Sequence, residues 1–283
     1  MSAPSPIKPG GRFGCKIVDR DRAEIEPILE RLLADARPLE VGLYYGDPAA
    51  REHLFRLRPG ARLPLTLHLD HRRLSLFDLH RQPELLHEQL GDAERLGATK
   101  VLTHVAAYPM TPRRERWQGL FEHLLPRFDT LASGCARRGL ELLIENTFHG
   151  DGFYRALFDR LPGGAGFCLD IGHAKVWAHA SLRGWLDFAE GLEAQGRRLH
   201  FHLHCNDGLA DQHRAFSEAA RAGQTAGDHF SGGQDYFSVL AALAARYPGS
   251  DKIFEVPPRL ALENLDAVLA AVSERPPSPA GVH

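Results

Sequence analysis

Residues 201–213 read Phe201-His-Leu-His-Cys-Asn-Asp-Gly-Leu-Ala-Asp-Gln-His213, a short apolar strand that runs into a polar loop. Side chains alternate between the two faces of a strand, so His202 and His204 share one face. The loop then adds Asp211 and His213, two further side chains of types that bind metal ions. The rest of the chain is organised around this pattern, a buried strand that ends in metal-binding residue types.

Three other segments end in the same way, with an apolar run that is closed by a carboxylate or an imidazole. They are Leu140-Glu-Leu-Leu-Ile-Glu145-Asn, Ala165-Gly-Phe-Cys-Leu-Asp170-Ile-Gly-His173 and Lys252-Ile-Phe-Glu255-Val. Two earlier apolar runs end in His68 and His104. One such residue could cap a helix or bind an arginine, but six strand endings of this kind are hard to explain in that way. On a closed barrel, the carboxyl ends of the strands meet at one mouth, where these side chains would converge.

Strand-like and helix-like segments alternate along the whole chain. We expect strands at about residues 13–18, 39–45, 62–68, 100–104, 140–145, 165–170, 201–204 and 252–255. We expect helices at about residues 19–34, 83–96, 114–138, 152–161, 182–195, 236–247 and 261–272, and a weaker one after residue 48. Eight strand–helix units in strict order favour a parallel sheet closed into a (β/α)8 TIM barrel, in a single domain. An open doubly wound sheet is the alternative, but Val18-Asp-Arg-Asp-Arg lacks the glycine-rich turn that would follow its first strand.

Length and composition are compatible with one large domain. The chain has 283 residues, of which 43% are hydrophobic and 25% charged. We place the barrel at residues 12–272, between a flexible leader (1–11) and a flexible tail (273–283). The 34 basic and 36 acidic residues nearly cancel, so the net charge gives no sign of a general nucleic-acid-binding or membrane-binding face.

Several features point to a cytoplasmic protein. No apolar stretch approaches the roughly 18–20 residues that span a bilayer, and the leader has no apolar signal core. The four cysteines form no CxxC pair, so we expect buried thiols in a reducing compartment (Cys15, Cys135, Cys168 and Cys205).

The carboxylate and imidazole side chains predict a divalent metal centre. Such ligands without a thiolate cluster suit zinc, manganese or iron, and argue against a structural zinc knuckle. We expect one to three ions per chain. The core ligands are Glu145, Asp170, His202 and Glu255, and the further candidates are His173, Asp211, His213, His68 and His104. Gly172 is expected to let the chain turn tightly, so that Asp170 and His173 face one pocket. Asp228 and His229, in the same long loop, are an alternative to Asp211 and His213.

Four residues are candidates for contact with a substrate. His204 would orient a metal ligand or touch the substrate. Arg113, in the loop after the fourth strand, would suit a phosphate or carboxylate, although a solvated helix start explains it slightly better. Asn146 and Lys175 offer hydrogen bonds to substrate oxygens. We interpret seven other histidines as solvent-facing or ordinary packing residues (His53, His80, His87, His123, His179, His200 and His283).

With these residues the chain resembles the xylose-isomerase-like TIM-barrel superfamily over residues 12–272. The resemblance is carried by Ile144-Glu145-Asn146, Leu169-Asp170-Ile-Gly-His173, the stretch 202–213 and Phe254-Glu255-Val. Similarity to the sugar isomerases and epimerases of this superfamily implies that Glu145, Asp170, His202 and Glu255 hold one ion. The two glutamates would flank the substrate, one removing a proton next to the carbonyl and the other returning it through an enediolate.

The endonuclease IV branch of the superfamily implies a different reaction. In that branch the set of nine residues would hold three zinc ions that hydrolyse a phosphodiester (His68, His104, Glu145, Asp170, His173, His202, Asp211, His213 and Glu255). The sequence departs from the pattern at Cys205, where these families often have aspartate, and in the long region between His213 and Ser231-Gly-Gly-Gln234.

Four interpretations therefore stay open. The first is a metal-dependent isomerase or epimerase of a small sugar or sugar phosphate, and the second is a phosphodiesterase of endonuclease IV type. A peptide-modifying multinuclear iron enzyme and a non-enzymatic barrel with a vestigial site are further alternatives. We expect a small-molecule substrate, with or without a phosphate group, rather than nucleic acid. We also expect no membrane partner, and the sequence leaves the oligomeric state open.

Overall fold

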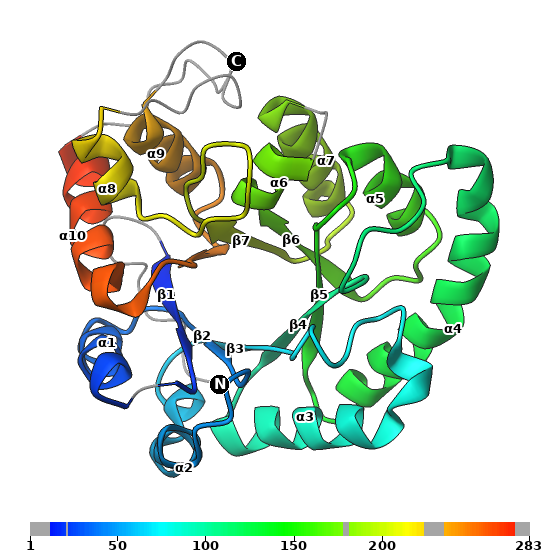
Figure 1. Cartoon of the computed structure of the whole chain (residues 1–283), viewed down its shortest axis with the longest axis horizontal. Coiled ribbons are helices and arrows are strands. Elements are labelled where there is room, and N and C mark those ends of the chain that lie inside the picture. Colours follow the sequence, from blue (N-terminus) through cyan, green and yellow to red (C-terminus); the bar gives the residue numbers. More distant parts are fainter. Residues whose placement is uncertain (1–11, 21, 178–180, 224–234, 275–283) are drawn as a thin grey trace.

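The computed structural model describes residues 12–20, 22–177, 181–223 and 235–274. Eight parallel strands pair in chain order, and β8 (Asp251–Phe254) pairs with β1 (Phe13–Val18), which closes the barrel. Figure 1 shows the strands at the centre of the molecule and the helices around the outside. The prediction of a TIM barrel in a single domain is therefore confirmed.

The other strands are β2 (Leu39–Gly42), β3 (Leu65–His68), β4 (Lys100–His104), β5 (Glu141–Glu145), β6 (Ala165–Asp170) and β7 (Leu199–Leu203). The α-helices are α1 (Arg22–Asp35), α2 (Pro48–Leu57), α3 (Pro83–Leu96), α4 (Trp117–Ala136), α5 (Asp151–Phe158), α6 (Ile171–Trp177), α7 (Leu182–Ala194), α8 (Phe216–Arg221), α9 (Tyr236–Arg246) and α10 (Pro258–Glu274). Short 3-10 turns are η1 (Pro59–Ala61), η2 (Leu79–Arg81) and η3 (Arg114–Arg116).

The predicted bounds of β4 and α3 agree with the structure, while β2 and β3 are shorter than predicted. Helix ends follow their local chemistry. Asp47 caps α2 by accepting hydrogen bonds from the amides of Ala49 and Ala50, and Gly97 ends α3 with a φ of 74°. The last helix extends to Glu274, two residues beyond its predicted end, and residues 275–283 of the predicted tail lie outside the described residues. The predicted leader, residues 1–11, lies outside the described residues.

Helix α6 was not predicted, and it changes the role of Gly172. The helix begins directly after β6, so the chain does not make the expected tight turn there. A Cβ atom on Gly172 would instead lie 2.0 Å from Cε1 of His204. Position 172 requires glycine because the imidazole of His204 packs against its backbone. The predicted reason, a tight turn at Gly172, was therefore wrong.

The main core lies between the barrel and its ring of helices. Trp185 of α7 stacks on Phe167 of β6, with ring centroids 6.1 Å apart, and both are fully buried. Burying a phenylalanine in this way contributes roughly 1.5–3 kcal/mol. Inside the barrel, Leu102, Leu143 and Cys168 form a separate small apolar cluster. The positions nearer the carboxyl ends of the strands carry polar side chains instead of a further apolar layer.

All four cysteines are free and buried, as predicted. Among the described residues, no helix has both the length and the apolar character that crossing a membrane requires.

Candidate metal centre

The carboxylate of Glu145, at the end of β5, lies between two pairs of imidazoles. Its Oε2 is 3.1 Å from Nε2 of His68 and 3.1 Å from Nε2 of His104. Its Oε1 is 3.3 Å from Nδ1 of His202 and 3.2 Å from Nδ1 of His173. The side chain is almost completely buried, so each oxygen faces a different group of nitrogen donors.

His202 of β7 lies at the centre of the four predicted core ligands. Its Nδ1 is 3.3 Å from Oε1 of Glu145, 3.3 Å from Oε1 of Glu255 and 3.8 Å from Oδ2 of Asp170. Its Nε2 is 2.9 Å from Oε2 of Glu40, a buried residue of β2. A carboxylate behind a histidine fixes the orientation of the ring, which here points Nδ1 towards the other ligands.

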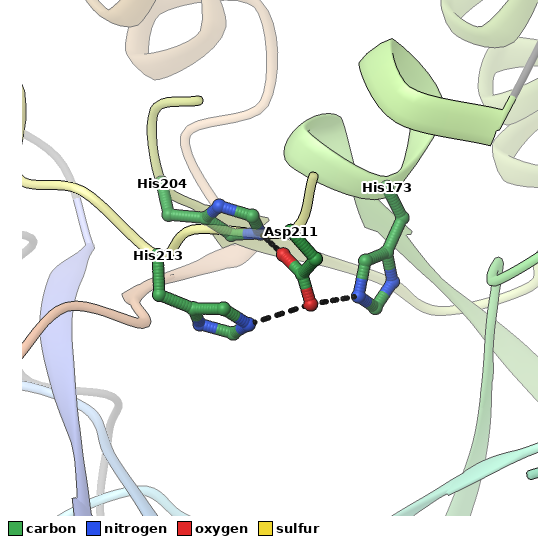
Figure 2. Close-up of side chains that lie close together, drawn as sticks. All are labelled: His173, His204, Asp211 and His213. Atoms are coloured by element: carbon green, nitrogen blue, oxygen red, sulfur yellow. Dashed lines mark hydrogen bonds and ion pairs between the residues drawn. The ribbon is translucent and has the colours of Figure 1, made fainter. Parts of the chain in front are cut away.

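A third group forms around Asp211, and Figure 2 shows its members. One carboxylate oxygen of Asp211 is 2.9 Å from Nε2 of His213 and 3.3 Å from Nε2 of His173. The other oxygen is 3.5 Å from Nε2 of His204. Because Cys205 and Arg214 pair through their backbones, the loop folds back and brings Asp211 and His213 over the ends of β6 and β7. Asp228 and His229, the alternative pair, lie outside the described residues.

Three of these histidines are oriented in the same way. Nδ1 of His68, His173 and His213 lies 2.8, 2.9 and 3.0 Å from a backbone carbonyl oxygen. Each Nδ1 can donate to its carbonyl while Nε2 faces a carboxylate, and on binding a cation Nε2 would exchange any proton it carries for the metal. Histidine ligands of metal ions are held by the same kind of contact.

Charges within the site keep its carboxylates ionised. Burial opposes ionisation of Glu145, but the imidazoles of His104 and His202 outweigh it and hold the pKa of this carboxyl well below its usual value. Burial is likewise outweighed at Asp211, where hydrogen bonds from His173 and His213 lower the pKa. The carboxylates of the site are therefore charged at neutral pH and can serve as ligands of a cation.

The donor atoms of the site fit a divalent cation. Glu145 Oε1, His202 Nδ1 and Asp211 Oδ1 are buried and make no hydrogen bond. An unsatisfied buried polar atom costs about 1–3 kcal/mol, and a cation between such atoms would satisfy several together. Mixed imidazole and carboxylate donors suit zinc, manganese and iron. The structure thus brings all nine predicted ligands into three adjoining groups.

The four predicted substrate contacts are placed differently. Asn146 is fully buried, and its side chain bonds the backbone of Asp170. Lys175 donates to the carbonyl of Asn206 and to the hydroxyl of Tyr236. His204 lies below the mouth, stacked on His213 at 4.2 Å. Arg113 is exposed. None of the four lines the two cavities at the mouth, so their contact with a substrate stays a prediction.

Three residues of the site were not among the predicted ligands. Glu40 and Lys16 face each other inside the barrel at 3.2 Å, and Lys16 also pairs with Glu255. His71 stacks on His104 with ring centroids 4.1 Å apart, and its Nδ1 is buried without a partner. Two sequence patterns could have identified these residues. Lys16 and Glu40 are each a charged residue within an apolar strand, and His71 follows His68 with His-x-x-His spacing. His200, interpreted as an ordinary packing residue, lies 3.3 Å from Glu40 within the barrel.

A cavity of about 450 Å³ opens above these groups. Its polar lining comes from the loops after β1 to β3 and from the metal-binding groups (Lys16, Arg20, Tyr44, Tyr45, His68, His71, Arg72, His104, His173, Asp211, His213 and Glu255). A second cavity of about 310 Å³ adjoins it at His71, Arg72, His104, His173 and Asp211, and adds Phe148 and Trp177. Glu145 lines neither cavity.

The family model of the xylose isomerase-like TIM barrel matches residues 73–272. Among solved structures, the zinc-soaked TTHB071 protein from Thermus thermophilus is 21% identical, with a TM-score of 0.68 over 94% of this chain and 99% of that one. A sugar phosphate isomerase/epimerase from Parabacteroides distasonis is 15% identical, with a TM-score of 0.58 over 97% of each chain. The IolI protein with a bound zinc atom is 12% identical, with a TM-score of 0.61 over 92% of this chain and 98% of that one. At these identities the likeness shows the fold alone. No curated protein sequence matches the chain.

Proposed function

Since the chain belongs to the xylose isomerase-like TIM-barrel family, we propose that it is a metal-dependent enzyme that hydrolyses a phosphodiester with two or three divalent ions. The observation that carries the proposal is the position of Glu145. One oxygen of this buried carboxylate faces His68 and His104 at 3.1 Å and the other faces His202 at 3.3 Å, so the two oxygens would be able to serve two separate ions.

The three groups of donors assign the ligands. His68, His104 and Glu145 would hold one ion, and Glu145, Asp170, His202 and Glu255 a second. His173, Asp211 and His213 would hold a third. Divalent ions at such a centre stabilise negative charge on phosphoryl oxygens and activate water for in-line attack.

The residues around the ligands hold this arrangement in place. Glu40 accepts a hydrogen bond from Nε2 of His202 and keeps the ring turned towards Glu145 and Glu255. Lys16 pairs with both Glu40 and Glu255, and so fixes the end of β8 against β1 and β2.

An isomerase or epimerase of a small sugar or sugar phosphate is the second candidate. Glu145 and Glu255 both lie 3.3 Å from Nδ1 of His202, and several structural neighbours are described as sugar epimerases. The burial of Glu145 disfavours this candidate. A base that removes a proton must reach the substrate, and Glu145 does not line the cavities at the mouth whereas Glu255 does.

Counting metal ions separates the two candidates. We expect two or three ions per chain, measured by mass spectrometry on protein that is purified without added metal and then loaded with zinc, manganese or iron. The loaded protein should hydrolyse bis(p-nitrophenyl) phosphate. His104→Ala should lose one ion, whereas His80→Ala, which changes an exposed histidine, should lose none. About one ion per chain, together with exchange of solvent protons into a ketose, would support the isomerase and exclude the phosphodiesterase.

A further inference from the structure

We propose that the rim of the mouth carries an anion subsite, formed by Arg20 and Arg72 over the ring of Tyr45. Its ligand is a second negatively charged group of the substrate, besides the phosphodiester at the metal centre. The role of this subsite rests on the proposed phosphodiesterase function. The substrate would then be a small phosphodiester that carries a further phosphate or carboxylate group.

The subsite is built around an exposed aromatic ring. Tyr45 is 53% exposed, and the guanidinium carbons of Arg20 and Arg72 lie 5.5 and 5.2 Å from its ring centroid. Arg72 also lies 5.5 Å from the ring centroid of Tyr44. All four side chains line the larger cavity. Stacking on aromatic faces holds a guanidinium flat and leaves its N–H groups free for an oxyanion.

A buried carboxylate holds this rim in place. Asp19, at the end of β1, is fully buried and accepts hydrogen bonds from the amides of Tyr45 at 2.8 Å and Gly46 at 3.0 Å. The guanidinium of Arg72 donates a hydrogen bond to the carbonyl of Tyr44 at 3.1 Å, and the backbone amide of Arg72 donates one to the carboxylate of Asp70 at 3.2 Å. The loops after β1, β2 and β3 are thus joined by hydrogen bonds, so binding a ligand here orders little additional chain.

The two guanidinium groups of this rim lie outside ion-pair distance of the described carboxylates. In residues 12–274, as far as the structure describes them, neither Arg20 nor Arg72 forms an ion pair with a carboxylate. By contrast, the two carboxylates that line the same cavity already have cationic or imidazole partners, since Glu255 pairs with Lys16 and Asp211 with His213. Two guanidinium groups that have no ion-pair partner and lie on a fixed frame favour a phosphate or carboxylate ligand.

The subsite is close enough to the metal centre for one small molecule to reach both. The ring centroid of Tyr44 lies 5.5 Å from the guanidinium of Arg72 and 5.5 Å from the ring of His68. Arg72 and His68 are therefore within twice that distance of each other. A cavity of about 450 Å³ also has the size of a small-molecule site.

Alkane bisphosphonates of increasing length, from methylene to hexamethylene, test the proposal on the zinc-loaded protein. Calorimetry compares each with the alkyl monophosphonate of equal length. We expect at least one bisphosphonate to bind tenfold or more tightly than its monophosphonate. The double variant Arg20→Met/Arg72→Met should remove this advantage and change monophosphonate affinity less than twofold.

Two further variants control for charge and folding. Arg73→Met removes the same charge from the same loop, but Arg73 does not line the larger cavity, so the advantage should remain. Tyr45→Leu changes an exposed side chain, so it should fold, and it should reduce the advantage several-fold because the guanidinium groups lose their support.

Several outcomes would overturn the subsite. One is an equal affinity for the bisphosphonate and the monophosphonate at every length. Another is a loss of the bisphosphonate advantage in Arg73→Met as large as in the double variant. A third is that short single-stranded DNA competes with a bound monophosphonate more strongly than any bisphosphonate does. The proposed function is scored separately, by metal count and phosphodiester hydrolysis. A bisphosphonate advantage without phosphodiester hydrolysis would support the subsite and refute the phosphodiesterase. Hydrolysis without a bisphosphonate advantage would support the phosphodiesterase and refute the subsite.

Discussion

Replacing Glu40 by glutamine should weaken metal binding, although Glu40 belongs to none of the three groups of ligands. Its carboxylate accepts a hydrogen bond from Nε2 of His202 at 2.9 Å, and both side chains are fully buried. Burial opposes ionisation of Glu40, but His202 and Lys16 hold its pKa well below the usual value, so the carboxylate is charged. Glutamine keeps the shape and an acceptor oxygen but removes the charge that makes His202 a stronger donor to a cation.

The expected loss follows from the difference between the two kinds of hydrogen bond. A hydrogen bond to a charged group contributes roughly 1.5–3 kcal/mol, against about 0.5–1.5 kcal/mol for a neutral one. A difference of about 1.4 kcal/mol corresponds to a tenfold change in affinity. We therefore expect one of the bound ions to be held about tenfold more weakly in Glu40→Gln, which agrees with the effects of residues behind metal ligands.

Competition with a fluorescent zinc chelator measures this affinity ion by ion. Glu141→Gln is the matched control, because Glu141 is exposed on β5 and pairs only with Arg198 in the described part of the chain. Thermal unfolding of the metal-free variants shows whether they fold equally well. An affinity within twofold of the wild type, or an equal loss in Glu141→Gln, would refute the assigned role of Glu40.

Three further predictions follow from the structure. Gly172→Ala should lower the free energy of unfolding by about 1–3 kcal/mol and weaken one ion, because the new Cβ would meet His204 at 2.0 Å. Gly191→Ala is the control, because nothing lies within 4 Å of the Cβ that it adds. Calorimetry measures the unfolding of both variants, and an equal change in their unfolding free energies would contradict this prediction. Asp211→Asn should lose one ion per chain by mass spectrometry and keep the others, whereas loss of every ion would argue against separate groups of ligands. Burial lowers the pKa of Lys252 from 10.5 to about 7, so between these values the unfolded chain binds a proton that the folded chain lacks. The stability of the wild type relative to Lys252→Met should therefore rise with pH from about 7 to about 10.5, by up to about 5 kcal/mol in denaturant titrations. A flat difference would show that Lys252 keeps its usual pKa.

The amino-acid sequence alone was sufficient to predict the barrel and the convergence of the nine predicted ligands. Alternation with period two puts His202 on a defined face of β7, and Glu145, Asp170 and Glu255 end their own strands in the same way. The carboxyl ends of parallel strands share one edge, so residues at the strand ends meet at one mouth. This inference requires no knowledge of distances. Both inferences depend only on local periodicity and on the order of the segments.

Contacts across the barrel were decided by the tertiary structure. Glu40 and His202 lie 162 positions apart in the sequence, on β2 and β7, and they meet because closure of the barrel brings their inward faces to within 2.9 Å. The packing of His204 against Gly172 likewise depends on how closely α6 approaches β7. Local sequence patterns specify which face a side chain occupies, but they contain no information about which side chain lies opposite. That is determined by the diameter and register of the closed sheet, to which all eight strands contribute together.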